Sequence, residues 1–193
     1  NLDGYIVPKN NNFFGEYVPV TEDNLKYISN FTGSAGFAII LKKKNFMFVD
    51  GRYTTQANIQ CGDNYKICTI PKKYPFNIFS GKSLNLGFDP KLHTENSLNM
   101  LFKNSFIKLK PISENLIDLI WKRKKDVNIK PFYLINNRDA GAKLEDKLSK
   151  LNKVINLNKA DYLFTTASEN VAWLLNIRGN DNDYSPLPNS HAF

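Results

Sequence analysis

Residue types that commonly build active sites are scarce in this chain of 193 residues, which has two histidines, two cysteines and four arginines. A catalytic zinc centre usually keeps a histidine among several converging ligands, and His93 and His191 each stand alone. Each is therefore interpreted as an exposed or capping histidine. Cys61 and Cys68 are separated by six residues with no histidine nearby, a spacing that fits no zinc or redox motif. The sequence predicts no metal site in this chain.

Long apolar segments are also missing. No run approaches the ~20 residues that a membrane helix needs, and residues 1–20 lack the charged and then apolar pattern of a signal peptide. Two cysteines in a chain without an export signal fit a reducing compartment. We expect a cytoplasmic protein that does not bind membranes. Because the chain does not begin with methionine, we also expect a short leader or tag to be absent from its start.

Arginine is scarce relative to lysine, although the net charge is +8. The chain has 22 lysines, 4 arginines and 26 asparagines, a bias that looks like codon drift toward lysine and asparagine. Nucleic-acid sites favour arginine and gather their cations on one face. The basic runs here, 42–44 and 122–125, instead suit a turn between strands and the end of a helix. We expect no nucleic-acid binding; the alternative, a basic nucleic-acid module, predicts steeply salt-dependent DNA binding.

Apolar residues are plentiful, at 42% of the chain with 13% aromatic, which is enough to form a core. Two apolar runs around the lysine turn, 37–41 and 45–50, predict an antiparallel hairpin. Further predicted strands are 4–8, 65–70, 84–88, 106–109 and 161–165. The predicted helices are one capped by Thr21 and ended by Gly33, and others at 53–60, 94–104 (capped by Thr94), 114–121, 142–154 and 169–176. This mixed order predicts an α/β fold with a mixed sheet flanked by helices.

One segment occurs twice. Residues 22–33 return in altered form as residues 168–179, at a constant offset of 146 that aligns Asn30 with Asn176. Each copy follows a short apolar run that begins at an aspartate, Asp3 or Asp161. A repeat at this spacing indicates two related domains rather than a solenoid, whose periods are ~20–50 residues. Only fourteen residues follow the second copy, so we expect the chain to end inside its second domain.

Two short motifs bear on chemistry. Ser34 lies in Gly33-Ser-Ala-Gly36, but the order of helix, turn and strand differs from a nucleophile elbow, and a tight, closely packed turn is the simpler interpretation. Asp50-Gly-Arg-Tyr53 places Arg52 where a strand ends and a helix begins. Its guanidinium could clamp a carboxylate, or it could pair with Asp50 and fix the turn, which the spacing alone favours. Arg178-Gly-Asn-Asp181 has a similar character.

Six segments, in the same order along nearly the whole chain, resemble the Xaa-Pro aminopeptidases (aminopeptidase P), in particular the three-domain cytosolic kind. They are Asp3-Gly-Tyr-Ile-Val-Pro8, Gly15-Glu-Tyr17, Phe31-Thr-Gly-Ser-Ala-Gly36, Asp50-Gly-Arg-Tyr-x-x-Gln-Ala57, Asn115-Leu-Ile-Asp-x-Ile-Trp121 and Val171-Ala-Trp-Leu-Leu-Asn-Ile-Arg-Gly-x-Asp181. The end of the chain departs from the pattern. That family usually reads Asn-Pro-Val-Phe-x-Ser-Tyr where this chain has Ser185-Pro-Leu-Pro-Asn-Ser-His191.

The resemblance implies a domain organisation. Residues 1–122 would form a creatinase/prolidase N-terminal-like domain, residues 123–131 a linker, and residues 132–193 a partial, truncated second domain of the same type. A C-terminal metallopeptidase domain would be absent from this chain. That domain would hold two divalent metal ions, manganese in most members, on ligands that do not lie within these residues, so the chain itself would contain no cofactor and no catalytic residue.

The resemblance also implies a function for the parent protein, which would be a dinuclear metal hydrolase that removes an N-terminal residue preceding proline. This chain would gate access for proline-containing peptides and support a homodimer, and it would be inactive alone. Arg52 is the predicted substrate-binding residue. Asp50, Tyr53, Arg178 and Asp181 are assigned structural or substrate-side roles. The main alternative is an aminopeptidase-like fold that has lost catalysis and binds peptides or basic proteins.

Overall fold

The computed structural model describes residues 1–123 and 130–193. The chain divides into two compact units. Unit 1 comprises Asn1–Asn12 and Val20–Lys125, and unit 2 comprises Phe13–Pro19 and Asp126–Phe193. Most of the predicted linker, 123–131, lies outside the described residues. The predicted domain boundaries therefore stay a prediction.

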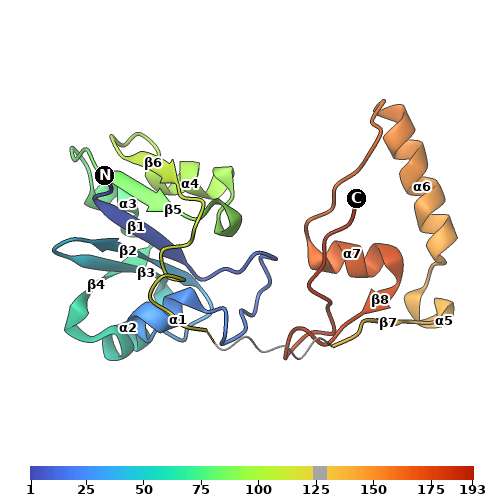
Figure 1. The fold of residues 1–193 in the computed structure, drawn as a ribbon, viewed down its shortest axis with the longest axis horizontal. Helices are drawn as coiled ribbons and strands as arrows, with labels where there is room; N and C mark the ends of the chain where they lie inside the picture. The colour runs from blue at the N-terminus through green and yellow to red at the C-terminus, as the bar shows by residue number, and fades with distance from the viewer. Residues whose placement is uncertain (124–129) are drawn as a thin grey trace. The chain divides into compact units, whose positions relative to one another are not determined.

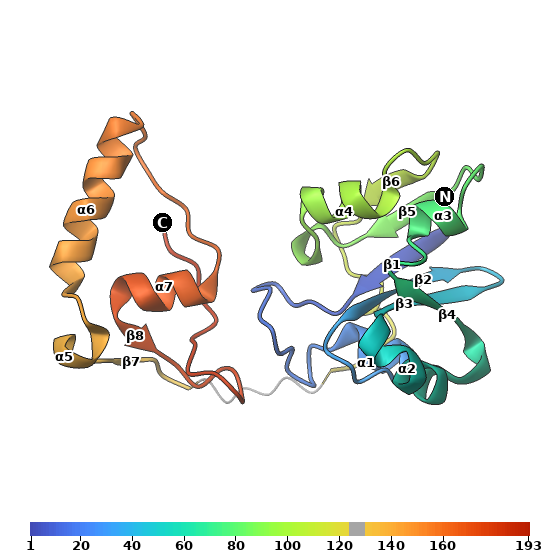
Figure 2. The same cartoon turned by 180° about the vertical axis from the view of Figure 1, so that it is seen from behind.

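Unit 1 is built on a six-stranded sheet with the order β4-β3-β2-β1-β5-β6 (Figures 1 and 2). β2 runs antiparallel to β1 and β3, and the other neighbouring strands are parallel. The predicted hairpin and the mixed sheet are confirmed. The strands are β1 (Gly4–Pro8), β2 (Gly36–Leu41), β3 (Asn45–Asp50), β4 (Tyr65–Ile70), β5 (Asn85–Phe88) and β6 (Lys108–Pro111).

Helices cover both faces of this sheet because successive side chains of a strand point to opposite sides. In β2, Phe37 and Ile39 join the core cluster that receives α3 and α4, whereas Ala38 joins the cluster that receives α1 and α2. The predicted α/β fold with flanking helices is thereby confirmed. The helices are α1 (Asn24–Ser29), α2 (Thr54–Cys61), α3 (Pro75–Ile78) and α4 (Glu95–Phe102), with 3-10 turns η1 (Gly51–Tyr53), η2 (Gly62–Asn64) and η3 (Pro90–Leu92).

Unit 2 has a much smaller core, in which Val171, Ala172 and Ile177 are the buried residues. Its two short strands, β7 and β8, pair antiparallel. The segment 13–19 belongs to this unit: the ring of Phe13 lies 5.0 Å from that of His191, and the ring of Tyr17 lies 4.9 Å from that of Tyr184. The elements are β7 (Tyr133–Leu134), α5 (Asn137–Ala140), α6 (Leu144–Leu157), α7 (Ser168–Leu175) and β8 (Ile177–Arg178).

Three predicted elements are wrong in part or in whole. Residues 114–121 form turns rather than a helix, because the side chain of Asn115 accepts the N–H of Ile117 at 2.9 Å and competes with helical hydrogen bonds. The strand predicted at 106–109 begins later, as β6. Residues 161–165 form no strand; in the described chain only Thr165 pairs there, in an isolated bridge to Ala192.

Two predicted helix starts had different outcomes. The predicted cap Thr21 is wrong, because α1 begins later and Asp23 accepts the N–H of Lys26 at 3.0 Å. The predicted cap Thr94 is confirmed by its hydrogen bond from the N–H of Ser97 at 3.2 Å. No helix in the described parts of the chain is both long and apolar enough to cross a membrane.

Candidate functional site

The Asp50–Tyr53 motif lies where β3 ends and η1 begins. Asp50 still has extended backbone angles, φ −60° and ψ 150°, and its side chain accepts the N–H of Arg52 at 2.9 Å, which starts the 3-10 turn. A short acceptor before a helical turn satisfies a donor that has no partner within that turn. The local sequence therefore fixes the direction in which Arg52 leaves the end of the sheet.

Arg52 combines an internal ion pair with an exposed side chain. Its Nε donates to Oδ1 of Asp50 at 2.9 Å, and the side chain is 75% exposed. The hydrogen bonds from Arg52 hold the pKa of the Asp50 carboxyl below its ordinary value, so the pair is charged at neutral pH. The internal pair inferred from the spacing is present. It engages only Nε, and the two terminal guanidinium nitrogens have no protein acceptor among the described residues.

Tyr53 connects the motif to the glycine-rich turn. Its hydroxyl lies 2.8 Å from Oγ of Ser34, and its ring packs edge-on to Phe31 with centroids 5.9 Å apart. A Cβ on Gly33 would overlap the ring of Phe31, and one on Gly36 would lie 2.9 Å from the Phe48 carbonyl oxygen. This close packing confirms the structural interpretation of the turn, and within the described residues Ser34 hydrogen-bonds to Tyr53 and to no histidine or carboxylate.

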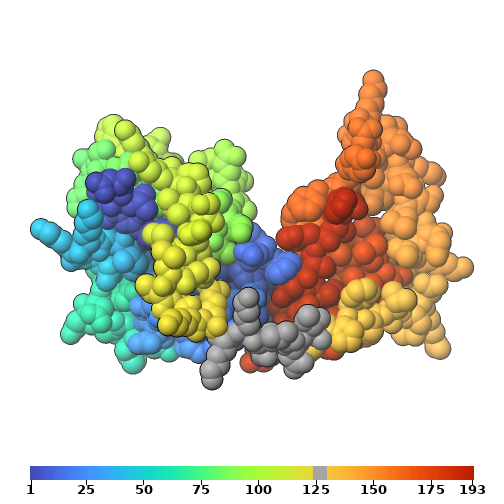
Figure 3. Space-filling view, in the orientation of Figure 1, coloured from blue at the N-terminus to red at the C-terminus, as the bar shows by residue number. Residues whose placement is uncertain are grey.

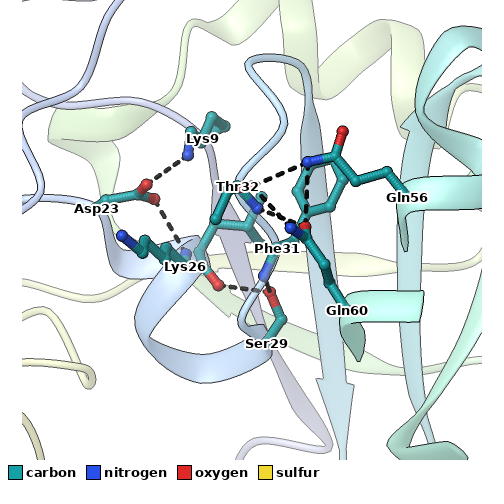
Figure 4. A network of polar contacts seen from close by, with 9 residues as sticks. Lys9, Asp23, Lys26, Ser29, Phe31, Thr32, Gln56 and Gln60 are labelled. Carbon is teal, nitrogen blue, oxygen red and sulfur yellow. Dashed lines mark hydrogen bonds and ion pairs between the residues drawn. The ribbon is translucent and has the colours of Figure 1, made fainter. Parts of the chain in front are cut away.

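A polar network that the sequence did not reveal lies between α1 and α2 (Figure 4). The side-chain amides of Gln56 and Gln60 both donate to Oγ1 of Thr32 at 2.8 Å, and Oε1 of Gln60 accepts the N–H of Thr32 at 2.9 Å. Gln56 and Gln60 are one helical turn apart, so both can reach the same residue. The only hint in the sequence is Gln56, which belongs to the resembling motif.

The other part of Figure 4 shows how α1 is anchored. Asp23 forms an ion pair with Lys9, and both side chains are almost fully buried. Asp23 also caps α1 through Lys26, as described above. A buried pair of opposite charges is costly to break because one charge would then be left without a partner. The pair therefore fixes the loop after β1 to the start of α1, the helix that leads into Thr32.

Arg178 and Asp181 lie in unit 2 and form no ion pair with one another. The guanidinium of Arg178 donates to the carbonyl oxygens of Ile177 and Ala172, at 2.8 and 3.3 Å. Asp181 accepts the N–H of Asn189 at 2.8 Å. These contacts hold the end of α7 and the following loop. Of the structural and substrate-side roles predicted for these two residues, the geometry supports the structural one.

Metal ligands do not gather in the described residues, where no group of three or more His, Cys, Asp or Glu side chains is placed to hold an ion. Of the two alternatives predicted for His93, the structure places it at a cap: His93 follows η3 as its C-cap residue and is half-buried rather than exposed. Its ring packs edge-on against Phe88, and burial lowers its pKa to about 4. His191 is exposed, with its ring against Phe13 and Phe164. The described residues therefore do not fit a two-metal centre.

Comparison with known proteins agrees with this fold. Residues 1–119 and residues 123–193 each match the creatinase/prolidase N-terminal domain. The chain is 32% identical to a probable Xaa-Pro aminopeptidase P of Coprinopsis cinerea, over 97% of this chain and 32% of that protein. It is also 32% identical to aminopeptidase P1 of Lotus japonicus, over 100% of this chain and 30% of that protein.

The fold also matches a solved structure. The X-prolyl aminopeptidase of Caenorhabditis elegans, described as a cytosolic enzyme with a di-nuclear active site, aligns with a TM-score of 0.88 at 26% identity. The alignment covers 98% of this chain and 32% of that one. The chain spans about a third of the length of the curated relatives that it matches.

Proposed function

This chain belongs to the creatinase/prolidase N-terminal domain family, and from that premise we propose that it is the non-catalytic N-terminal part of a metallo-aminopeptidase that removes an N-terminal residue preceding proline. The observation that carries the proposal is the similarity to Xaa-Pro aminopeptidase P over the whole chain. We assign cleavage, and the two divalent metal ions (manganese), to a C-terminal domain of the parent protein. Residues of this chain would bind and orient substrate.

Arg52 is the residue that we assign to substrate. A guanidinium can hold a carboxylate with two parallel hydrogen bonds. Within the described chain the two terminal nitrogens of Arg52 have no protein acceptor, while Asp50 fixes Nε. Asp50 thus orients the side chain of Arg52, and its two terminal nitrogens can still donate hydrogen bonds to a ligand. We propose that it binds the C-terminal carboxylate of a short proline-containing peptide. Tyr53 would support the guanidinium, whose Cζ lies 5.6 Å from the centroid of its ring.

The remaining parts of the proposal concern the parent protein. We infer that this chain limits access to the active site to short peptides and that the parent is a cytoplasmic homodimer. The Caenorhabditis elegans protein is described as cytosolic, which supports the location. No described contact bears on dimerisation.

An activity assay tests the main proposal. The longer polypeptide encoded by the natural gene, supplied with manganese, should release the first residue of Xaa-Pro peptides, and the 193-residue chain should release none. Cleavage by the 193-residue chain would contradict the proposal. A metal-loaded longer polypeptide that binds these peptides without cleaving them would instead favour the catalytically inactive peptide-binding module.

A variant pair tests the role of Arg52. In the longer enzyme, Arg52→Gln should raise KM about tenfold for a peptide with a free C-terminal carboxylate, because a charge-assisted hydrogen bond contributes ~1.5–3 kcal/mol. Arg52→Lys keeps the charge but loses the two parallel hydrogen bonds of the guanidinium. Its KM should therefore lie between those of the unaltered enzyme and of Arg52→Gln. The same peptide with a C-terminal amide is the control. If Arg52→Gln changes KM equally for the acid and the amide, the guanidinium does not bind the carboxylate.

A further inference from the structure

The two edges of the unit 1 sheet differ in how they can pair. β6 has four residues and carries Lys108, Lys110 and Pro111, and lysine and proline both discourage the addition of another strand. β4 has six residues that pair in register with β3, and within it only Lys66 is charged. Figures 1 and 2 show β4 at the outside of the sheet. β4 is therefore the edge that can accept a further strand.

The outer backbone of β4 has few other contacts. Apart from the ladder with β3, the hydrogen bonds to its backbone among the described residues are the N–H of Lys73 to the Thr69 oxygen, at 2.9 Å, and the Cys68 thiol near the Lys66 oxygen, at 3.8 Å. Unpaired N–H and C=O groups along an edge form a template for a peptide in extended conformation. Among the described residues, no strand lies beyond β4 in the sheet order.

The two faces of β4 differ in chemistry because its side chains alternate. Cys68 and Ile70 join the cluster beneath α3 and α4, and Lys66 lies on the same face at the open end of the strand. Tyr65 and Ile67 join the cluster beneath α1 and α2. A strand added beside β4 would therefore place alternate residues on a face that is charged at Lys66 and apolar at Cys68 and Ile70, and the residues between them on the apolar face of Tyr65 and Ile67.

Two more positive charges act on the middle of β4. The Nζ of Lys44 lies 5.7 Å from the centroid of the Phe46 ring, and Phe46 pairs with Lys66 across the ladder. Burial raises the pKa of the Cys68 thiol, and the positive charges of Lys66, Lys73 and Lys44 oppose that rise. Lys44 extends from the turn between β2 and β3, which projects from the surface in Figure 3. None of these three lysines forms an ion pair in the described part of the chain.

A hollow of about 480 Å³ adjoins the start of β4. Lys43, Lys44 and Lys66 line it together with one acidic residue, Asp63. Its net charge is positive, and it lies where an added strand would begin or end. The hollow can therefore take an acidic side chain or the terminal carboxylate of a bound peptide.

We propose that the β4 edge binds an extended acidic peptide segment as a seventh strand of the sheet. Its carboxylates would occupy alternate positions on the face of Lys66, and apolar or β-branched side chains would lie beside Tyr65 and Ile67. The lysines beside β4 select acidic side chains, and the alternation of side chains along the edge selects an extended segment. Together they define the kind of partner. This proposal is independent of the proposed peptidase function, because it uses neither Arg52 nor a catalytic domain.

Fluorescence anisotropy with labelled peptides tests the proposal on the 193-residue chain. The probe is a peptide in which Glu and Val alternate, and it should bind saturably at low salt. A peptide of the same composition with its Glu residues grouped together should bind about tenfold more weakly, because it cannot match both faces. The alternating peptide with N-methylated amides should lose binding, because it keeps the charge but cannot donate to the edge.

Charge-reversal variants locate the site. Lys44→Glu with Lys66→Glu should weaken binding of the alternating peptide about tenfold or more. The matched control is Lys108→Glu with Lys110→Glu, which changes the net charge equally at the other edge and should leave binding within about twofold. All four lysines are exposed, so the fold should be preserved. If the Lys44 and Lys66 variant unfolds, the N-methylated peptide still tests the edge on the unaltered chain.

Three outcomes would overturn the proposal. Equal weakening by both pairs of variants would show attraction by the overall charge alone. Unchanged binding of the N-methylated peptide would rule out strand addition. Tighter binding of a DNA oligonucleotide, abolished by the same two substitutions, would show that the lysines form a nucleic-acid surface instead.

Discussion

The helix of the first repeat copy, α1, packs on a six-stranded sheet, whereas the helix of the second copy, α7, packs against α6 and β8 in the described part of unit 2. Both helices nevertheless end in the same way. Asn30 and Asn176 have left-handed backbones, with φ of 60° and 54°, and their N–H groups donate to the carbonyls of Lys26 and Ala172. The repeat thus preserves the left-handed asparagine that ends each helix. It does not preserve the core against which the helix packs.

The two copies also satisfy the last helical carbonyls with different chemistry. In the first, the hydroxyl of Tyr65 donates to the carbonyl oxygen of Ile28 at 2.6 Å. In the second, the buried ammonium of Lys147 donates to the carbonyl oxygen of Trp173 and, at 2.6 Å, to Oδ1 of Asn176. A cation at a helix C-terminus is favourable. Unit 2 therefore relies on a charge from α6 where unit 1 relies on an aromatic residue of its sheet.

The largest expected difference concerns the aligned core residues Leu25 and Val171, which are 0% and 1% exposed. Leu25→Ala should lower the free energy of unfolding of unit 1 by about 2–5 kcal/mol, because a cavity is left under a rigid sheet. Val171→Ala removes less and lies in a smaller core, so unit 2 should lose about 1–2 kcal/mol.

The two tryptophans allow this pair to be measured unit by unit. Trp121 reports on unit 1 in a Trp173→Phe background, and Trp173 reports on unit 2 in a Trp121→Phe background. Urea unfolding followed by fluorescence should show each alanine variant moving only its own transition. A shift of both transitions by either variant would mean that the two units unfold as one.

The second prediction uses pH to separate the units. Burial lowers the folded-state pKa of His93 from 6.5 to about 4, so the unfolded chain takes up a proton first as the pH falls. The contribution of His93 to the free energy of unfolding is full above about pH 6.5 and is lost as the pH falls toward 4. Between pH 7 and 4.5 the loss in unit 1 should be about 2 kcal/mol.

Histidine variants isolate this effect from other titrating groups. His93→Gln should flatten the pH dependence of the Trp121-reported transition, and His191→Gln, at the exposed histidine of unit 2, should leave that pH dependence unchanged. An equally steep pH dependence in His93→Gln would show that carboxylates, rather than this imidazole, set the acid sensitivity.

The smallest expected effect is the change in stability when the asparagine that ends each helix is replaced by glycine. This change should have opposite signs in the two copies of the repeat. Asn30→Gly should stabilise unit 1 by up to about 1 kcal/mol, because glycine adopts a left-handed backbone without strain and the exposed side chain of Asn30 makes no hydrogen bond in the described chain. Asn176→Gly should destabilise unit 2 by about 1 kcal/mol, because the side chain that binds Lys147 and the carbonyl oxygen of Ala142 is lost. Thermal unfolding of both variants checks the signs; equal signs would remove the distinction between the two caps.

The hairpin and the repeat could be predicted because their signals are local. Apolar runs on both sides of a lysine turn define β2 and β3, and the prediction of residues 45–50 matches β3. The helix predicted at 114–121 failed although the apolar spacing was right, because the side chain of Asn115 accepts the N–H of Ile117 and the backbone hydrogen bonds that follow close turns. The strand predicted at 161–165 failed because a strand needs neighbours that its own sequence does not specify.

The candidate site was predictable only where its members are close in sequence. The pair of Asp50 and Arg52 follows from two-residue spacing and a turn. The contact of Tyr53 with Ser34, and the contacts of Thr32 with the two glutamines of α2, join residues 19 to 28 positions apart. Those contacts depend on how α1 and α2 lie across the sheet, which no local pattern encodes.

The placement of residues 13–19 in unit 2 has a consequence for dissecting this protein into fragments. A fragment that starts at residue 132 would lack Phe13 and Tyr17, the rings that pack against His191 and Tyr184. The C-terminal unit is therefore discontinuous in sequence, and cutting the chain between its two family matches would expose aromatic surface on the fragment. A synthetic peptide of residues 13–19, added to this fragment, would supply the two missing rings. The unit is therefore suited to reassembly from two separate fragments.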